Sequence, residues 1–400
     1  MSAPPPPSAP KHLIRSHAAA VSVVHISDDN ERIYSGDANG NVVITSTRSL
    51  RAVASWKAHT DGLLGVQEWE ERVITHGRDN KLHVWSGVRE PPRAVGGSAA
   101  LPGLQTPELC YSLDVNALNF CRFSLLPLPP DARTDERQAL LAVPNLVESA
   151  YADVWTLPGK QRLHAAIGKA SQAPQAADVR NPIGIIMCMH LSSVPHPHAA
   201  GRAPRLRLLC GYENGSVTMR GYAHEDKEVS IEGIGWDSLW SVRLHVESVM
   251  AITVSVDGAF ALSVSADHLI GQYNIAEAES ADNVQEACTV FKTKHPGNGS
   301  VAIKDDGRIC AVGGWDGRVR LYSTKSFKPL GTLAYHKKNC QCIAFARAQP
   351  APSTPPTDAD GEESDDEMTE QEKMDRTRWL VSGGQDSRVA IWSLINFGKT

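Results

Sequence analysis

Apolar and polar residues alternate along this chain in short stretches, and a small polar turn precedes each stretch. Six of these turns align without gaps, each with an Asn or Asp in its fifth position: residues 35–40, 75–80, 210–215, 263–268, 312–317 and 382–387. An apolar segment leads into each turn, and alternation with a period of two follows it, as in residues 82–85 and 389–392. This period is typical of strands with one buried face, so the pattern predicts repeated β-hairpins that bend at an Asx residue.

A histidine stands upstream of most of these turns at a regular distance. The first four precede the Asx of their turn by 22, 20, 22 and 21 residues, and they are His17, His59, His245 and His295. His336 instead precedes Asp386 by 50 residues. The excess of about 29 residues matches a proline-rich and acidic stretch, 348–376, so an insertion into an otherwise regular unit is predicted there.

The 135 residues between Asp79 and Asn214 leave room for a seventh unit without a turn motif. Its predicted strands are residues 117–124, 139–143 and 152–157, with Trp155 at a strand end, and the next unit takes residues 162–167, 184–190 and 206–210. Four short antiparallel strands cannot bury both faces alone, but radially stacked units can. We therefore predict an all-β, seven-bladed propeller. An N-terminal strand at residues 12–15 completes the last blade and removes a free edge.

The predicted propeller spans residues 12–396, and two segments are predicted to be disordered. Residues 1–11 are a proline-rich leader. Residues 351–376 are an acidic insertion within blade seven, where residues 358–376 alone carry ten acids and two bases. Ser364 has acids on both sides and resembles an acidophilic-kinase site, while a solvated charge run without regulation is the alternative.

Charge and composition exclude several classes of function. The chain has a net charge of −5, of which residues 358–376 contribute −8, so the remainder totals +3 and shows no basic stripe. This disfavours direct binding of nucleic acid. The eight cysteines include no Cys-x-x-Cys pair, which favours reduced, buried thiols over a metal site. No apolar stretch approaches the ~20 residues of a membrane span, and the first residues lack the features of a signal peptide. We predict no cofactor, metal or small-molecule substrate.

A histidine, a glycine-rich turn with Asp and a strand ending in Trp or Tyr together resemble the WD-repeat family over residues 12–394. That resemblance implies a buried tetrad, in which the His binds the turn Asp while a Ser or Thr and the Trp complete the network. The matching residues are His59, Thr75, Asp79 and Trp85 in blade two, and His336, Ser382, Asp386 and Trp392 in blade seven. The other blades with a turn carry Thr45, Arg220, Tyr273 and Tyr322 at the Trp position, so we expect incomplete tetrads there.

A His and an Asp near a hydroxyl also occur in nucleophilic triads, so catalysis is the competing interpretation. The pairing recurs in at least four units, however, whereas an active site occurs once. The sequence also lacks a nucleophile elbow, a dinucleotide fingerprint, a phosphate-binding loop and a zinc-hydrolase helix. It therefore predicts a structural role for these residues and no enzymatic activity.

Four segments, residues 56–66, 74–85, 184–187 and 209–215, together resemble the fungal ASTRA-associated protein 1 family. The resemblance implies a subunit of the nuclear ASTRA complex, which is connected with chromatin remodelling and with the maturation of PIKK-family kinases. The implied role is a non-catalytic protein-interaction scaffold in the nucleus, with the cytoplasm as a second compartment. Its implied partners are the other subunits, a PIKK-family kinase and its maturation factors. A generic WD-repeat adaptor, such as a ubiquitin-ligase substrate receptor or a cytosolic signalling platform, is the alternative.

Residues just before each Asx are expected to project around one rim of the ring. Arg78 and Trp315 are our candidates for partner binding there, because an exposed tryptophan is a frequent interface anchor. The alternatives are that Trp315 packs against the neighbouring blade and that Arg78 is only a solvated charge.

Overall fold

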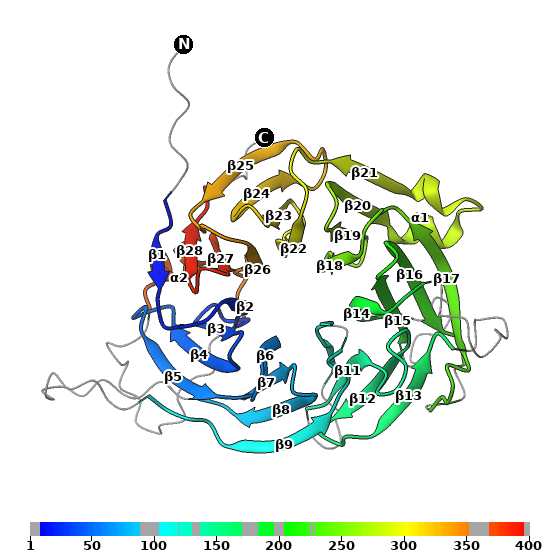
Figure 1. Ribbon diagram of the computed structural model, residues 1–400, viewed down its shortest axis with the longest axis horizontal. Coiled ribbons are helices and arrows are strands. Elements are labelled where there is room, and N and C mark those ends of the chain that lie inside the picture. The colour runs from blue at the N-terminus through cyan, green and yellow to red at the C-terminus, as the bar shows by residue number, and fades with distance from the viewer. Residues whose placement is uncertain are drawn as a thin grey trace, which may run out of the picture.

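Seven four-stranded antiparallel sheets surround a central axis in the computed structural model of the protein (Figure 1). The structure describes residues 9–88, 104–118, 120–129, 137–169, 183–195, 204–224, 227, 229–351 and 368–395. Each sheet forms one blade, and neighbouring blades follow one another around the ring in chain order. The predicted seven-bladed, all-β propeller is therefore confirmed.

The strands of the first four blades have the following bounds. Blade one contains β2 (Val21–Ile26), β3 (Arg32–Asp37), β4 (Asn41–Ser46) and β5 (Ala52–Lys57). Blade two contains β6 (Leu63–Trp69), β7 (Arg72–Gly77), β8 (Lys81–Ser86) and β9 (Leu109–Asp114). Blade three contains β10 (Ser124–Pro127), β11 (Ala139–Pro144), β12 (Ala152–Leu157) and β13 (Arg162–Ile167). Blade four contains β14 (Ile186–Val194), β15 (Arg205–Tyr212), β16 (Ser216–Tyr222) and β17 (Trp236–Arg243).

Of the remaining three blades, five and seven carry short helical segments as well. Blade five contains β18 (Val249–Val254), β19 (Phe260–Ser265), β20 (Leu269–Asn274) and β21 (Cys288–Lys292), with α1 (Ile275–Ser280) and the 3₁₀ turn η1 (Val284–Ala287) before its last strand. Blade six contains β22 (Asn298–Ile303), β23 (Ile309–Gly314), β24 (Arg318–Ser323) and β25 (Pro329–Ala334). Blade seven contains β26 (Cys340–Phe345), β27 (Trp379–Gly384), β28 (Val389–Ser393) and β1 (His12–Ile14), and α2 (Glu370–Arg376) precedes β27. Within the described residues, no helix has the length and hydropathy that crossing a membrane requires.

The ring closes through its first strand, as predicted. Blade seven has the order β1-β28-β27-β26, and β1 pairs antiparallel with β28 so that Leu13 lies opposite Ala390. The sequence repeat and the blade do not begin at the same strand. Each repeat begins with the outer strand of one blade and continues with the three inner strands of the next. Every repeat therefore connects two neighbouring sheets covalently.

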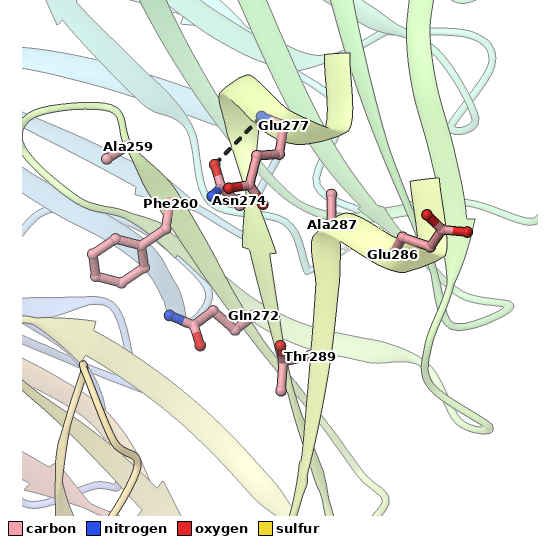
Figure 2. A pocket seen from close by; sticks show the side chains of 8 residues that line it. All are labelled: Ala259, Phe260, Gln272, Asn274, Glu277, Glu286, Ala287 and Thr289. Carbon is pink, nitrogen blue, oxygen red and sulfur yellow. Dashed lines mark hydrogen bonds between the residues drawn. The ribbon is translucent and has the colours of Figure 1, made fainter. Parts of the chain in front are cut away.

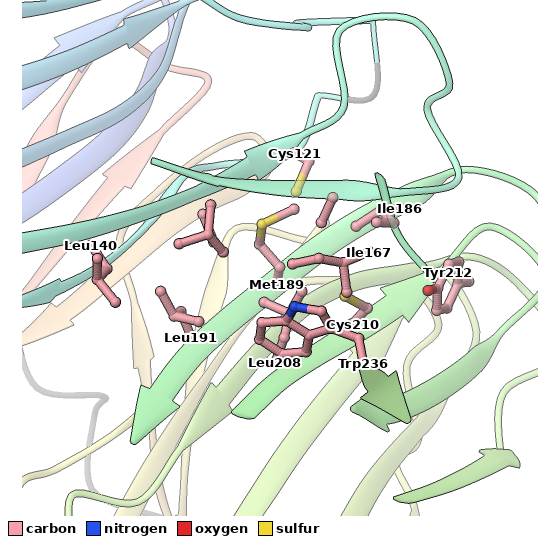
Figure 3. Packing of buried hydrophobic residues seen from close by; sticks show 13 residues of the cluster. Cys121, Leu140, Ile167, Ile186, Met189, Leu191, Leu208, Cys210, Tyr212 and Trp236 are labelled. Atoms are coloured by element: carbon pink, nitrogen blue, oxygen red, sulfur yellow. The ribbon is translucent and has the colours of Figure 1, made fainter. Parts of the chain in front are cut away.

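The hydrophobic core lies between the blades. The second strands β11, β23 and β27 are buried along their whole length, whereas the outer strands β9 and β25 are mostly exposed. Between blades three and four, apolar side chains from both sheets fill the space, with Leu140 on β11, Met189 on β14 and Trp236 on β17 (Figure 3). Each second strand is covered on both faces by the sheets of the neighbouring blades, which explains why its sequence is mostly apolar.

Two predictions about boundaries need correction. The described residues 117, 118 and 120–123 are not in a strand, since the first strand of blade three, β10, begins at Ser124. The preceding Asn116 donates hydrogen bonds to the Asn145 carbonyl at 2.8 Å and to the Ser149 hydroxyl at 3.0 Å. The predicted strand failed because this unit lacks the turn motif that aligned the others.

The predicted disorder of residues 351–376 is also wrong at its C-terminal end, where α2 forms. Thr369 and Glu372 make a capping box, in which each side chain accepts a hydrogen bond from the backbone N–H of the other. Arg376 is buried and donates hydrogen bonds to the hydroxyl and the carbonyl of Thr47 in blade one, both at 3.1 Å. The high charge of the segment concealed this helix. Ser364 and most of the predicted leader, residues 1–8, lie outside the described residues.

Candidate interaction surface and its supporting networks

The structure brings the predicted tetrad residues of blade two together. The Nδ1 and Nε2 atoms of His59 lie 2.8 Å from Asp79 Oδ1 and 2.8 Å from Thr75 Oγ1, and the indole N–H of Trp85 donates to Thr75 Oγ1 at 2.9 Å. The indole N–H can only donate, so Thr75 Oγ1 accepts from it. The Thr75 hydroxyl can then donate to Nε2 of His59, and the Nδ1–H of His59 donates to the Asp79 carboxylate. The network therefore fits a neutral imidazole beside an ionised Asp79.

The pKa shifts in blade two agree with this assignment. Burial lowers the pKa of His59, although Asp79 partly opposes the effect. Burial alone would raise the pKa of Asp79, but hydrogen bonds from the Thr60 backbone N–H and from His59 outweigh it and hold that pKa below its ordinary value. The pair is thus a hydrogen-bonded link between the loop before β6 and the turn after β7.

Blade seven repeats the same arrangement. His336 Nδ1 lies 3.0 Å from Asp386 Oδ1, its Nε2 lies 2.9 Å from Ser382 Oγ, and the Trp392 indole donates to that hydroxyl at 2.9 Å. The 50 residues that separate His336 from Asp386 do not change the geometry, because the insertion lies between β26 and β27 at the far end of the blade.

Blade five corrects the expectation that a tyrosine leaves the tetrad incomplete. His245 lies 3.1 Å from Asp267 and 2.7 Å from Ser263, and the Tyr273 hydroxyl lies 2.8 Å from Ser263 Oγ. A phenol hydroxyl can therefore take the place of the indole N–H at this strand end.

Blade one pairs its histidine with a different turn residue from the one the spacing indicated. His17 lies 3.0 Å from Asp37 and 2.8 Å from Ser35, so Asp37 replaces Asn39 as the acceptor. The backbone N–H of Asn39 instead donates to Asp37 at 2.9 Å. A carboxylate accepts more strongly than an amide, and this sets the partner.

Blade six has an ion pair where the other blades have a histidine. His295 is exposed, and Asp316 accepts hydrogen bonds from the Arg320 guanidinium at 2.5 Å and 3.1 Å. A Cβ on Gly314 would lie 2.8 Å from Arg320 Nη1, just as one on Gly384 would lie 2.5 Å from His336 Nδ1. The guanidinium therefore occupies the position of the imidazole.

These networks do not have the form of a catalytic or metal site. His59, Asp79 and His83 form the one group in the described part of the chain whose ligand atoms could meet at a metal ion. Both nitrogens of His59 already have hydrogen-bond partners, and the Nδ1 atom of His83 lies 2.7 Å from the Ser112 hydroxyl. An ion would have to break the tetrad that joins the two loops, so the geometry favours the structural role.

A hollow of about 320 Å³ lies beside α1 in blade five (Figure 2). Its lining includes two carboxylates, on Glu277 and Glu286, but no histidine, cysteine, lysine or arginine. Asn274 is the N-cap of α1, and its side chain accepts a hydrogen bond from the backbone N–H of Glu277 at 3.4 Å. The hollow thus offers carboxylates, amides and the Thr289 hydroxyl, and its lining has no basic or sulfur-containing side chain.

The two predicted partner-binding residues lie on one face of the ring but on different blades. Arg78 is in the turn of blade two and Trp315 is in the turn of blade six, so blades one and seven separate them. The Arg78 guanidinium lies 4.5 Å from the Phe120 ring centroid, and Phe120 is itself exposed. Trp315 is 46% exposed, so its side chain is available at the rim.

Sequence reasoning missed the basic side chains around Trp315. Lys294 and His295 belong to the loop before β22, Lys337 and Lys338 to the loop before β26, and Arg318 follows the turn itself. The sequence does contain two short basic pairs, 294–295 and 337–338, at the upstream histidines of blades six and seven. These pairs lie about 40 residues apart, so their proximity was not evident.

Comparisons with known proteins agree with the fold. The WD domain, G-beta repeat model matches residues 289–323. ASTRA-associated protein 1 of Verticillium alfalfae is 31% identical over 403 residues, which cover 96% of this chain and 92% of that protein. The Aspergillus niger protein of the same name is 30% identical, with 97% and 98% covered. Mouse guanine nucleotide-binding protein subunit beta-like protein 1 is 25% identical, with 98% and 97% covered.

Proposed function

This chain belongs to the ASTRA-associated protein 1 family, and from that premise we propose that it is a non-catalytic scaffold subunit of the nuclear ASTRA complex. We propose further that it takes part in chromatin remodelling and in the maturation of PIKK-family kinases, in the nucleus and secondarily in the cytoplasm. The observation that carries the proposal is the similarity of nearly whole chains, which covers 96% and 97% of this chain rather than one repeat.

The geometry supports a scaffold because the tetrad side chains are hydrogen-bonded to one another within the blades. The His, Asp and hydroxyl groups of blades one, two, five and seven hydrogen-bond to one another, which holds loops in place and leaves rim side chains to vary. Arg78 and Trp315 are such rim residues, and we assign them to contacts with protein partners of the complex. A rigid platform loses little conformational entropy on binding, which suits an assembly role.

Affinity purification of the tagged full-length chain from its own cells, followed by mass spectrometry, tests this proposal. We expect recovery of ASTRA subunits and of a PIKK-family kinase with its maturation factors, and nuclear fluorescence of a tagged chain. Recovery of ubiquitin-ligase subunits in their place would support the generic adaptor instead. Trp315→Ala and Arg78→Ala should each reduce recovery of at least one partner without changing the melting temperature.

The acidic insertion has its own test. Ser364→Ala and deletion of residues 352–367 should both alter the recovered partners if Ser364 is a regulatory phosphosite. Unchanged recovery in both variants would identify the segment as a solvated charge run.

A further inference from the structure

The turn of blade six holds an exposed tryptophan against a backbone shelf. The Trp315 backbone N–H donates to the Gly297 carbonyl at 2.8 Å, and a Cβ on Gly297 would lie 2.6 Å from the indole ring. Gly297 has a φ of 83°, a conformation that favours glycine. The indole therefore lies directly on the main chain, and it offers its other face at the rim with little side-chain freedom to lose on binding.

Two loops enclose this turn. The contact with Gly297 fixes it to the loop before β22, which continues from Lys294 and His295. On the other side, a Cβ on Gly317 would lie 2.2 Å from the carbonyl oxygen of His336 and 2.7 Å from that of Lys338. The turn is thus held between the two loops, and both loops carry exposed residues beside it.

Those exposed side chains are basic. We call the group the Trp315 surface, and it consists of Trp315 with Lys294, His295, Arg318, Lys337 and Lys338. No ion pair joins any of these five bases to a carboxylate within the described residues. Of the acids in the adjoining turns, Asp316 pairs with the Arg320 guanidinium, whereas Asp386 is hydrogen-bonded to His336 and to the Lys337 backbone N–H. Three lysines and Arg318 outnumber this one carboxylate, so a net positive charge surrounds an aromatic anchor.

We propose that the Trp315 surface binds an acidic peptide segment of a partner protein, with an apolar side chain on the indole and carboxylates on the surrounding bases. This assignment rests on the proposed scaffold function, and it adds the chemistry of the partner. Charge complementarity supplies attraction and orientation, while the indole supplies contact area.

The composition of the surface favours a peptide over a nucleic acid. Proteins that bind single strands combine a longer basic track with several stacking aromatics. Here one exposed indole and five bases occupy one turn and its two flanking loops, and the loop before β18, on the same face, carries the exposed acid Glu247. A short acidic segment matches this extent.

Fluorescence anisotropy with the purified full-length chain tests the proposal. The probe is a fluorescein-labelled synthetic peptide of alternating Asp and Leu residues. We expect Trp315→Ala, and separately the double variant Lys337→Glu/Lys338→Glu, to weaken binding by about tenfold or more, which corresponds to ~1.4 kcal/mol or more. Raising the salt concentration should weaken binding further, because these charges are exposed to solvent.

The matched control is Lys325→Glu/Lys328→Glu. It makes the same change of charge in the same blade, but in the turn between β24 and β25 at the opposite face of the ring. Binding by this variant should equal that of the parent. Thermal unfolding monitored by circular dichroism checks that every variant is folded.

Three results would overturn the proposal: unchanged affinity in both surface variants, equal binding of a peptide of alternating Lys and Leu residues, or tighter binding of a single-stranded oligonucleotide through the same side chains. These results are independent of complex membership. Peptide binding without recovery of ASTRA subunits would reject only the proposed function, whereas recovery of those subunits without peptide binding would reject only this inference.

Discussion

Acidification should destabilise this propeller through His76, a buried histidine outside the tetrads. Its side chain has no exposed area, and neither ring nitrogen has a hydrogen-bond partner among the described residues. The ring lies 6.2 Å from that of Phe123, at the contact between blades two and three. The pKa of His76 is lowered from 6.5 to about 3, mainly by burial; the nearby His59 adds to the lowering and Asp79 opposes it.

The sign and size of the effect follow from the two protonation states. The unfolded chain binds a proton at His76 near its ordinary pKa of about 6.5, whereas the folded chain does so only near pH 3. Between these values the unfolded state binds more protons, so stability is complete above pH ~6.5 and falls as the pH falls. At ~1.4 kcal/mol per pH unit, the free energy of unfolding decreases by about 2 kcal/mol between pH 6.5 and pH 5 on account of this residue.

Urea unfolding of the parent and of His76→Leu at about pH 7.5, 6.5 and 5 measures this contribution. Leucine has a similar volume and removes no hydrogen bond, so we expect it to preserve stability at neutral pH and to flatten the loss in acid. His295→Gln is the control, because it removes an exposed imidazole and should leave the pH dependence as in the parent. Other buried histidines, such as His164 with a pKa near 4, contribute equally to parent and variant. Parallel curves for the parent and His76→Leu would refute the reasoning.

Three further changes test the supports of the ring. Ser382→Ala leaves the imidazole and the indole N–H of the blade seven tetrad unpaired, and it should cost about 2–4 kcal/mol in denaturant unfolding, while exposed Ser326→Ala should cost almost nothing. Removing residues 1–14 takes away β1 and exposes the edge of β28, so light scattering should detect self-association that the full chain does not show. Arg376→Ala loses charged hydrogen bonds to blade one and should lower stability by ~1.5–3 kcal/mol, whereas Met374→Ala, on the exposed side of the same helix, should not.

The ring was predictable because its signals depend on local backbone chemistry. An Asx turn between two alternating strands favours a β-hairpin over other structures. The recurrence of a histidine some 20 residues upstream indicated which loop contacts which turn. The N-terminal strand was predictable for a related reason, since the last unit ended without an outer strand. Each of these arguments used the order and spacing of segments along the chain and no side-chain contact.

What remained beyond prediction depends on atoms that meet in space. Tyr273 completes a tetrad because its hydroxyl reaches Ser263, a distance that the strand pattern does not contain. His17 meets Asp37 instead of Asn39, because two acceptors lie within one turn and only the folded geometry selects between them. The basic side chains beside Trp315 come from three segments, so their total charge appears only after the loops are placed side by side.

In blade six, the loss of the tetrad explains why the histidine His295 lies at the surface. The position that carries Ser or Thr in the tetrads is Val312 here, so a buried histidine would leave its Nε2 atom without a partner, at a cost of roughly 1–3 kcal/mol. His295 is exposed instead, and Arg320 takes its place beside Asp316 over Gly314. The ion pair satisfies the turn carboxylate, and the exposed imidazole lies two residues before Gly297, on which Trp315 rests. In blades one, two, five and seven the corresponding histidine is buried and hydrogen-bonded within its blade, so blade six is the one of these five whose histidine can contribute to a binding surface.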